Sequence, residues 1–403
     1  MTSSSTPALA VLGGSPVFPQ GLRFVHPKPP ALKRLMERLE PMLESGRLTN
    51  YGPYVQAFER AIAERTGAAH CVAVANATLG LLLVPWAWQL GGEVIAPSFT
   101  FSATVHALVW NRLTPVLVDI DPRTLTLDPG AVEAAIGPQT QAIVAVCIFG
   151  IPPDLRALEV IAKRHGLRLL YDTAQGFGSR YAERPLGGFG DAEVLSFHAA
   201  KTLPTGEGGA VVTNDAALAQ TVRLACNFGN PGSGDCTVVG LNAKMSEWSA
   251  LLGLAGLETF DRDLAHRRAL WAQYQRRLSA IPGLSLPELP AGAEGNGQNC
   301  AVLVDEARFG LTRDELEAVL AAEGIECKRY FDPPIHRMQA YREVRVRLGP
   351  LPVTERVCRT ILCLPLHPRM GMEDIERVCD LIEACPAQPV QIRRQLAKES
   401  RRA

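Results

Sequence analysis

The sequence lacks the features that mark membrane, secreted and nucleic-acid-binding proteins. Lysine plus arginine and aspartate plus glutamate both number 41, so no basic excess favours nucleic acid or anionic lipid. The most apolar stretch, residues 79–88, is too short to span a bilayer. Residues 1–5 lack the basic and apolar regions of a signal peptide. We therefore expect no nucleic-acid partner and no membrane partner.

Disulfide and metal frameworks are also missing. The ten cysteines are scattered through predicted strands and helices, as with Cys71, Cys147 and Cys363, and no C-x-x-C pair occurs. The eight histidines show no metal-ligand spacing. Free, buried thiols in a reducing compartment explain this pattern best, so we predict a cytoplasmic protein without a metal site.

What the sequence does contain is a regular alternation of apolar runs and helical patterns. It begins near residue 69 and continues to about residue 230. Helices are predicted between several of the strands, for example at residues 79–89, 129–136 and 153–165. The alternation predicts an α/β fold with a mostly parallel sheet flanked by helices. The predicted strands are residues 70–75, 93–96, 115–120, 142–148, 167–172, 192–197 and 209–213.

A second, smaller unit is predicted after this region. A long helical stretch at residues 245–281 is followed by a Pro/Gly-rich bend at 282–298. We divide the chain into a large domain with the N-terminal segment (1–260), a small α+β domain (261–386) and a basic, disordered tail (387–403). The elements predicted in the small domain are strands at 300–304, 326–330 and 361–364 and helices at 312–322, 353–360 and 372–384.

Lys201 is the main candidate for chemistry. It lies in a glycine-rich bend between two apolar strands that are predicted to be buried, and Asp172 ends the strand before them. A lone lysine is usually a solvated charge, but low-dielectric surroundings favour the neutral amine, which is a nucleophile. This pair is the arrangement that pyridoxal phosphate (PLP) requires. The lysine amine forms a Schiff base with the cofactor aldehyde, and the acid pairs with the protonated pyridine nitrogen.

Further candidates follow the other strand ends. Asn76-Ala77-Thr78 opens a helix and is either a phosphate cradle or an ordinary N-cap. Ser196 is placed to donate a hydroxyl to the same phosphate. One of Phe99 and Phe101 is expected to stack on the pyridine ring while the other packs in the core.

Two polar residues accompany the pair. Gln175 is predicted to bond the ring's phenolic oxygen. For His198, three residues before Lys201, we favour a positioning or packing role.

Together these motifs resemble the DegT/StrS family of PLP-dependent sugar aminotransferases, which have the aspartate aminotransferase-like (type I) fold. The resemblance covers nearly the whole chain, from residue 12 to residue 368. The most specific motifs are Asp172-x-Ala174-Gln175, Ser196-Phe197 with Lys201, Gly206-Glu207-Gly208-Gly209, and Asn242-Ala243-Lys244-Met245-Ser246-Glu247.

The resemblance implies a role for each matching residue. Lys201 would carry the cofactor, Asp172 would hold the pyridine nitrogen, Gln175 would lie near the phenolic oxygen and Phe101 would stack on the ring. Asn242 would reach the cofactor phosphate of a neighbouring subunit, which implies a homodimer with shared active sites. From the sequence alone, Asn242 could equally cap a helix.

Two motifs depart from the family pattern. The family's usual Ser-Gly-Thr cradle is Asn76-Ala77-Thr78 here, and its Asn-Tyr-Arg is Asn242-Ala243-Lys244. These variants resemble the subgroup that aminates C4 of a dTDP-4-keto-6-deoxy-glucose. Some relatives replace the lysine with histidine and remove a hydroxyl, and Lys201 argues against that chemistry.

The resemblance predicts transfer of an amino group from glutamate to a nucleotide-linked keto sugar in aminodeoxysugar biosynthesis. Two alternatives remain: a 3-keto sugar or a cyclitol ketone as acceptor, and a non-catalytic sensor or scaffold. Tyr330 and His336 either line the mouth of the substrate pocket or pack within the small domain.

Overall fold

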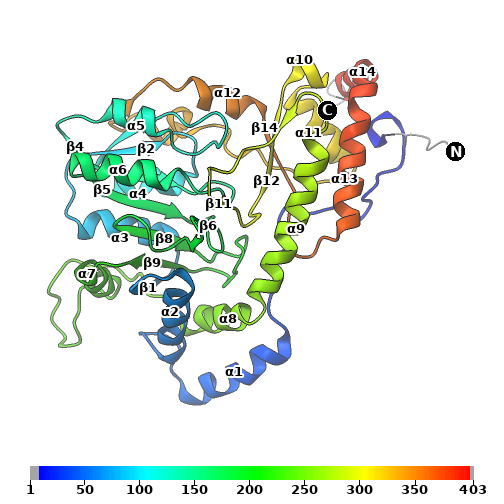
Figure 1. Cartoon of the computed structure of the whole chain (residues 1–403). Coiled ribbons are helices and arrows are strands. Elements are labelled where there is room, and N and C mark those ends of the chain that lie inside the picture. Colours follow the sequence, from blue (N-terminus) through cyan, green and yellow to red (C-terminus); the bar gives the residue numbers. More distant parts are fainter. Residues whose placement is uncertain (1–8, 400–403) are drawn as a thin grey trace.

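The computed structural model describes residues 9–399, which form a large lobe and a small lobe joined by the long helix α9 (Phe260–Leu278) (Figure 1). An eight-stranded sheet forms the centre of the large lobe, and all its strands run parallel except β9. In spatial order the strands are β1 (His70–Val74), β9 (Gly209–Thr213), β8 (Ala192–Ser196), β5 (Arg168–Thr173), β4 (Thr140–Val146), β2 (Glu93–Pro97), β3 (Thr114–Val118) and β13 (Arg347–Leu348).

The predicted α/β class and mostly parallel sheet are confirmed. The seven predicted strands form with ends within two residues of the expected ones. Apolar side chains lie on both faces of these strands, and helices bury both faces. One face is covered by α3 (Ala77–Ala87), α4 (Ser102–Trp110) and α7 (Ala216–Cys226); the other is covered by α2 (Pro53–Thr66), α5 (Pro129–Ala135), α6 (Leu155–His165) and α8 (Glu247–Leu257).

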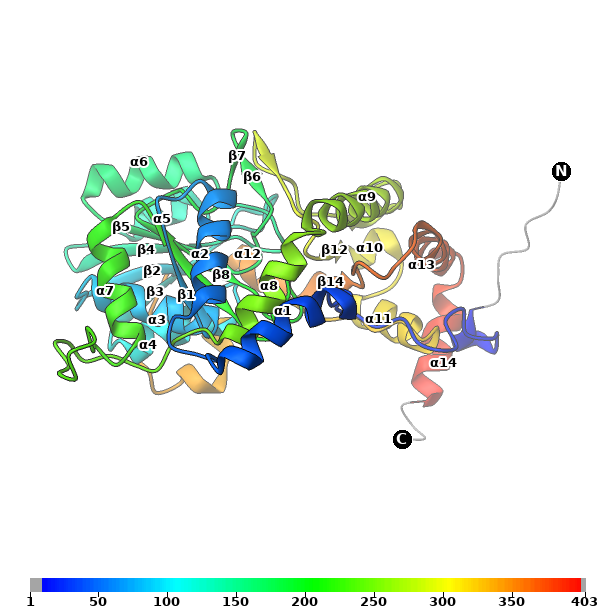
Figure 2. The ribbon, with the colours of Figure 1, turned by 90° about the horizontal axis from the view of Figure 1, so that it is seen from below.

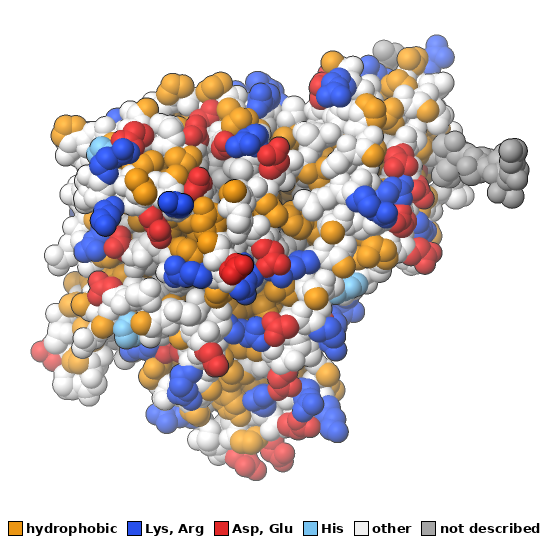
Figure 3. Space-filling model, viewed as in Figure 1, with side chains coloured by type: hydrophobic (Ala, Val, Ile, Leu, Met, Phe, Trp, Pro, Cys, Tyr) orange, Lys and Arg blue, Asp and Glu red, His pale blue; other side chains and the backbone are white. Residues whose placement is uncertain are grey.

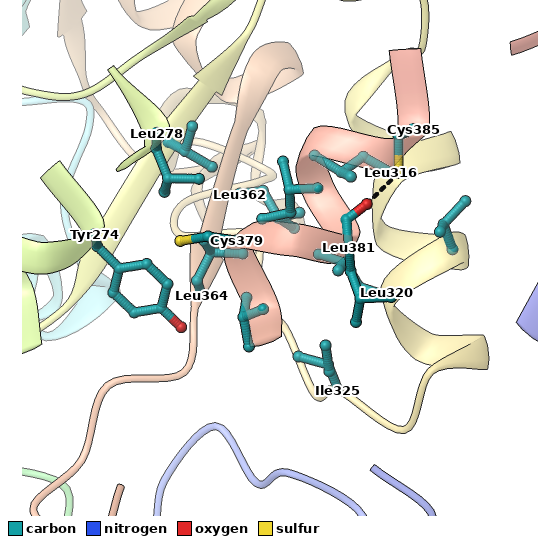
Figure 4. Close-up of a cluster of buried hydrophobic side chains, with 14 of the residues drawn as sticks. Tyr274, Leu278, Leu316, Leu320, Ile325, Leu362, Leu364, Cys379, Leu381 and Cys385 are labelled. Atoms are coloured by element: carbon teal, nitrogen blue, oxygen red, sulfur yellow. Dashed lines mark hydrogen bonds between the residues drawn. The ribbon is translucent and has the colours of Figure 1, made fainter. Parts of the chain in front are cut away.

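The small lobe is built around a three-stranded antiparallel sheet with its own hydrophobic core, part of which Figure 4 shows. Tyr274, Leu362 and Leu381 are among the buried residues of that core. The elements of the lobe are β10 (Leu284–Ser285), β12 (Cys300–Val304), β14 (Ile361–Leu364), α10 (Glu306–Phe309), α11 (Arg313–Ala322), α13 (Met372–Ala384), η4 (Cys385–Ala387) and α14 (Pro389–Glu399).

Short elements link the lobes. In a small three-stranded sheet, β11 pairs with β6 of the large lobe, and β6 pairs with β7. From the N-terminus, the chain crosses from the small lobe to α1 (Leu32–Ser45) and then enters the large lobe (Figure 2). The remaining elements are η1 (Ala10–Leu12), β6 (Arg180–Tyr181), β7 (Arg184–Pro185), β11 (Ala293–Glu294), η2 (Ile335–Arg337), η3 (Gln339–Tyr341) and α12 (Pro352–Thr360).

The predicted boundaries differ from the structure at both ends of the small lobe. Leu9 and Leu22 of the N-terminal segment are buried in the small-lobe core, and Glu323 accepts the backbone N–H groups of Ala10 and Val17. The segment assigned to the large domain therefore packs on the small lobe. Conversely, β13, which was assigned to the small domain, pairs with β3 at the edge of the large sheet.

Two predicted local structures are wrong. The strand expected at 326–330 is a single bridge between Lys328 and Cys363, after which the chain turns away. The tail expected to be disordered from residue 387 contains helix α14, whose Ile392 is fully buried. Arg393 pairs with Glu306 at 2.7 Å and Glu315 at 2.8 Å, so ion pairs and the apolar contacts of Ile392 and Leu396 hold this basic helix. Residues 400–403 lie outside the described residues.

The helices and the surface were compared with what a membrane span and a metal site require. Within residues 9–399, every helix is too short or too polar to cross a bilayer. The same residues contain no cluster of three or more His, Cys, Asp or Glu side chains that could hold a metal ion. On the face shown in Figure 3, positive and negative side chains are interspersed.

Candidate active site

A cavity of about 880 Å³ lies between the two lobes, at the carboxyl end of the parallel strands. Ligands bind at this edge in open α/β sheets because the connecting loops diverge there. Both lobes line it: Asp172 and Lys201 come from the large lobe, and Tyr330 comes from the C-terminal part of the chain. The predicted site residues that line this cavity are Asn76, Ala77, Thr78, Phe101, Asp172, Gln175, Ser196, Lys201 and Tyr330.

Asp172 is a buried carboxylate held by two donors. It lies in β5, one residue before the strand ends, and is 4% exposed. Its Oδ1 accepts the N–H of Ala174 at 3.1 Å and its Oδ2 accepts the hydroxyl of Thr104 at 2.7 Å. Burial raises the pKa of Asp172, while the Thr104 and Ala174 hydrogen bonds and the charge of Lys201 oppose that rise. Each oxygen keeps acceptor capacity for a further donor.

Lys201 lies on the bend between β8 and β9. Backbone bonds close this bend, from Phe197 N–H to the Gly208 carbonyl at 2.9 Å and from Ala199 N–H to the Gly206 carbonyl at 2.8 Å. Lys201 is half-buried and lines the cavity. Burial lowers the pKa of Lys201 to about 8, against the opposing charge of Asp172. At pH 7 about a tenth of the amine is therefore uncharged and nucleophilic, far more than for a lysine of ordinary pKa.

The N-terminus of α3 opens on the same cavity. Asn76 caps the helix, because its Oδ1 accepts the N–H of Leu79 at 3.0 Å, so the N-cap interpretation is confirmed. Within residues 9–399, no group accepts a hydrogen bond from the N–H of Ala77 or Thr78. A Cβ added to Gly209 would lie 2.6 Å from the Ala77 nitrogen. Only glycine at the start of β9 lets the strand pack this closely under a helix N-terminus that can bind an anion.

The two phenylalanines after β2 occupy different environments. Phe99 is 1% exposed and packs edge-on against Phe149 and Phe331. Phe101 is 60% exposed and lines the cavity, 6.3 Å from the Phe331 ring. An apolar ring this exposed beside a cavity is free to stack on a bound aromatic group.

Gln175 and Ser196 complete the large-lobe wall. The Gln175 Oε1 accepts the N–H of Phe149 at 2.5 Å, which leaves its amide N–H groups as donors toward the cavity. Ser196 ends β8 and its hydroxyl oxygen lies 3.4 Å from the N–H of His198. The His198 Nδ1 accepts the N–H of Ala200 at 3.1 Å, which closes a turn just before Lys201.

Two predicted site residues are not part of the cavity lining. His336 is held by Ser98 at 2.7 Å and by Glu355 at 2.8 Å, which fits the packing alternative. Asn242 is exposed and pairs by a bridge with Asn227. It does not cap α8, because Ser246 holds that position through the N–H of Ser249 at 3.2 Å.

Sequence reasoning missed three residues. Thr104 looks like any core threonine in the sequence, so nothing there marks its bond to Asp172. Gln298 and His367 line the cavity from the small lobe, and the Gln298 Oε1 and both His367 ring nitrogens are buried without a hydrogen bond of normal geometry among the described residues. Burial, His26 and Arg267 lower the pKa of His367 to about 4, although the nearby Arg23 carbonyl opposes this. The only sequence signal is a polar residue shortly after a buried strand, since His367 comes three residues after the end of β14.

Comparison with known proteins identifies the family. A model of the DegT/DnrJ/EryC1/StrS aminotransferase family matches residues 31–383. The dTDP-4-amino-4,6-dideoxy-D-glucose transaminase of Shigella dysenteriae is 35% identical over 357 residues, 89% of this chain and 97% of that protein. The erythromycin biosynthesis sensory transduction protein EryC1 of Saccharopolyspora erythraea is 36% identical over 337 residues, 83% of this chain and 90% of that protein.

Among solved structures, DesI, crystallised in the presence of its TDP-sugar product, is 42% identical with a TM-score of 0.89. That match covers 98% of this chain and 99% of the DesI chain. Sequence and structure agree over nearly the full length, and the chain belongs to the DegT/DnrJ/EryC1/StrS aminotransferase family.

Proposed function

We propose that this protein is a PLP-dependent aminotransferase that moves an amino group from glutamate to a nucleotide-linked keto sugar. The observation that carries the proposal is the cavity shared by Lys201 and Asp172, a buried amine and a buried carboxylate. The net reaction converts glutamate to 2-oxoglutarate and the sugar ketone to an amine, so it needs no external oxidant or reductant.

The lining of the cavity fits PLP in four respects. The amine of Lys201 suits the aldehyde, the carboxylate of Asp172 suits a protonated ring nitrogen, and the α3 N-terminus suits a phosphate. Phe101 offers a face for the ring. When bound, the cofactor supplies an aldehyde that carries the amino group and a ring that withdraws electrons from the reacting carbon.

Each residue then has a defined task. Asp172 keeps a proton on the ring nitrogen, because its ionised oxygens accept but do not donate. Gln175 donates to the ring's phenolic oxygen, and Ser196 with the N–H groups of Ala77 and Thr78 binds the phosphate. In each half of the reaction, the free amine of Lys201 would take a proton from the carbon that gives up the amino group and deliver it to the carbon that receives it, so the amine is neutral again at the end of each half.

The substrate class is supported by the names of similar proteins. The Shigella relative is named as acting on a dTDP-4-amino-4,6-dideoxy-D-glucose, and DesI was solved with a TDP-sugar product. We therefore propose a dTDP-4-keto-6-deoxyhexose as acceptor, in aminodeoxysugar biosynthesis, with Tyr330 on the substrate side of the cavity. A 3-keto sugar and a cyclitol ketone are the alternative acceptors.

We also propose a homodimer in which Asn242 serves the neighbouring subunit's site. Asn242 is exposed and lies outside the cavity of its own chain. Large apolar side chains near it are exposed, with Val239 at 85% and Trp248 at 43%. A second copy of the chain would cover them. Mixing Lys201→Ala and Asn242→Ala subunits tests this, because only a shared site lets two defective chains form one working site.

The function is tested with purified protein reconstituted with PLP. We expect a visible absorption band that glutamate bleaches, and an amino sugar by mass spectrometry when dTDP-4-keto-6-deoxy-glucose is added. NMR of the product then assigns the carbon, and nitrogen on any carbon other than C4 would contradict the proposed regiochemistry. Lys201→Ala provides the inactive control, and an active Lys201→Ala enzyme would overturn the mechanism.

A second function has one supporting observation. The EryC1 relative is named as a sensory transduction protein, which favours a non-catalytic role for a similar chain. A protein that binds PLP but is not bleached by any amino donor would support that role.

We also propose a location in the reducing cytoplasm. All ten cysteines are free, which supports this location.

A further inference from the structure

Two buried hydroxyls, those of Thr104 and Thr100, lead to Asp172 beside the cavity, and Thr100 itself lines the cavity. Thr104 donates to the Asp172 Oδ2 at 2.7 Å, and its hydroxyl lies 2.9 Å from that of Thr100. Thr100 is 0% exposed and Thr104 is 1% exposed, so water does not compete for these bonds. This buried chain ends on the carboxylate that we assign to the cofactor ring.

Counting hydrogens fixes the direction of the chain. A hydroxyl has one hydrogen, and an ionised carboxylate only accepts. With Asp172 ionised, Thr104 donates its one hydrogen to Asp172, so Thr100 must donate to Thr104. A proton on the Asp172 Oδ2 would oppose this order, because the carboxyl would become the donor. The two directions of the chain thus correspond to the two charge states of Asp172.

The same turn of helix also holds Phe101. The N–H of Thr104 donates to the Phe101 carbonyl at 3.2 Å, and Phe101 is the N-cap residue of α4. The first turn of α4 therefore fixes both the exposed ring at the cavity and the partner of the buried carboxylate.

We propose that Thr104, supported by Thr100, is a positioning residue that holds Asp172 ionised and oriented toward the cofactor's ring nitrogen. This inference rests on the proposed function. The other titratable groups that face Asp172 are Lys201 from the bend and Cys147 from the end of β4. Glu193 lies on the opposite face of the sheet, since it neighbours Tyr171 rather than Asp172 in the strand register.

The test compares Thr104→Val with Thr104→Ser. Valine keeps the shape without the donor, whereas serine keeps the donor. We expect Thr104→Val to bind PLP about tenfold or more weakly, because a hydrogen bond to a charged group is lost. The loss of PLP affinity relative to the wild type should grow as the pH falls from 8 to 6, because Asp172 takes up a proton more readily in Thr104→Val than in the wild type. Thr104→Ser should restore both the affinity and its pH dependence.

Thr126→Val is the matched control. Its hydroxyl is also buried and lies 2.8 Å from that of Thr124, but neither residue lines the cavity. We expect its PLP affinity to equal that of the wild type. Thr100→Val removes only the second hydroxyl and should weaken PLP binding less, with the same pH trend, so it carries the test if Thr104→Val does not fold.

The outcomes separate this inference from the proposed function. If the wild type does not bind PLP, both fail. If the wild type binds PLP and Thr104→Val matches it at every pH, the positioning role is wrong while the proposed function stands. If Thr104→Ser is as defective as Thr104→Val, the effect is one of packing and the inference is also overturned.

Discussion

The two walls of the cavity are built differently. On the large-lobe wall, Asp172, Ser196 and Lys201 stand in or just after strands of one sheet, and both oxygens of Asp172 are hydrogen-bonded. On the small-lobe wall, Gln298 and His367 lie outside helices and strands, and the Gln298 Oε1 and both His367 ring nitrogens are buried without a hydrogen bond of normal geometry to any residue in 9–399. The protein alone fixes the carboxylate of the first wall, while the N–H groups of Ala77 and Thr78 and the amide N–H groups of Gln175 stay available for a cofactor. The second leaves polar atoms for a substrate to satisfy, so we expect it to govern substrate selection.

The largest effect is expected from removing the amine of Lys201, because we assign the chemistry to the large-lobe wall. Lys201→Met keeps the length of the side chain but has no amine. We expect turnover to fall by at least about 10³-fold, because an essential nucleophile and proton carrier is lost. Mass spectrometry of the amino sugar measures this. Lys163→Met, an exposed lysine on α6, should keep full turnover. Substantial activity in Lys201→Met would show that this wall is not the reactive one.

Gly209→Ala tests the close packing of that wall. The added Cβ would lie 2.6 Å from the Ala77 nitrogen and 2.7 Å from the Asn76 carbonyl carbon, both backbone atoms that cannot move independently. We expect PLP affinity to fall more than about tenfold, together with about 1–3 kcal/mol of stability from overpacking. A PLP titration followed by absorbance measures the affinity. Gly91→Ala, where no atom lies within 4 Å of the added Cβ, should leave it unchanged.

The contrast between the walls also explains what the sequence could predict. Asp172 and Lys201 follow apolar runs whose burial is visible locally, and parallel strands bring their carboxyl ends to one edge. Their convergence in one cavity could therefore be predicted without long-range information. The α/β class and the strand positions followed from the same local pattern.

The features that could not be predicted from the sequence depend on contacts between segments that are distant in the chain. The sequence left His336 open between the pocket mouth and packing, and Ser98, more than two hundred positions earlier, holds it outside the cavity lining. The basic tail looked solvated, but Glu306 and Glu315 bind its Arg393. Composition reports the charge of such a residue and says nothing of the partner that folding brings to it.

Glu193→Gln tests whether water reaches the buried carboxyl of Glu193, which lies in β8 of the large-lobe sheet. Glu193 is buried and accepts bonds from Thr173 at 2.6 Å, Gly187 at 2.7 Å and Phe189 at 2.9 Å. Burial raises its pKa from 4.5 to about 7. The folded state therefore retains a proton that the unfolded state releases near pH 4.5. The resulting stability is complete below that pH and is lost as the pH rises through 7.

Glutamine removes this titration and keeps an acceptor oxygen for the two N–H groups. We expect the free energy of unfolding of the wild type, relative to Glu193→Gln, to fall by up to about 3 kcal/mol between pH 5 and 8. Urea denaturation at several pH values measures it. Glu64→Gln, an exposed residue on α2, should show no such trend. A pH-independent difference for Glu193→Gln would mean that water reaches this carboxyl.

His367→Phe addresses the small-lobe wall, and its expected effects are the smallest. Phenylalanine removes two buried nitrogens that have no hydrogen bond of normal geometry within residues 9–399, and it keeps an aromatic ring beside His26, 5.5 Å away. We expect stability to rise by about 1 kcal/mol, because no bond is lost and a desolvation cost disappears. The KM for the keto sugar should rise, while PLP affinity stays the same.

His336→Phe is the matched comparison for that variant. Both of its ring nitrogens are hydrogen-bonded, so the same substitution should destabilise the protein. Thermal unfolding and steady-state kinetics separate the two histidines. If His367→Phe lowered stability as much as His336→Phe did, the polar atoms of the small-lobe wall would already be satisfied without substrate. That result would contradict the claim that the small-lobe wall leaves polar atoms for the substrate to bind.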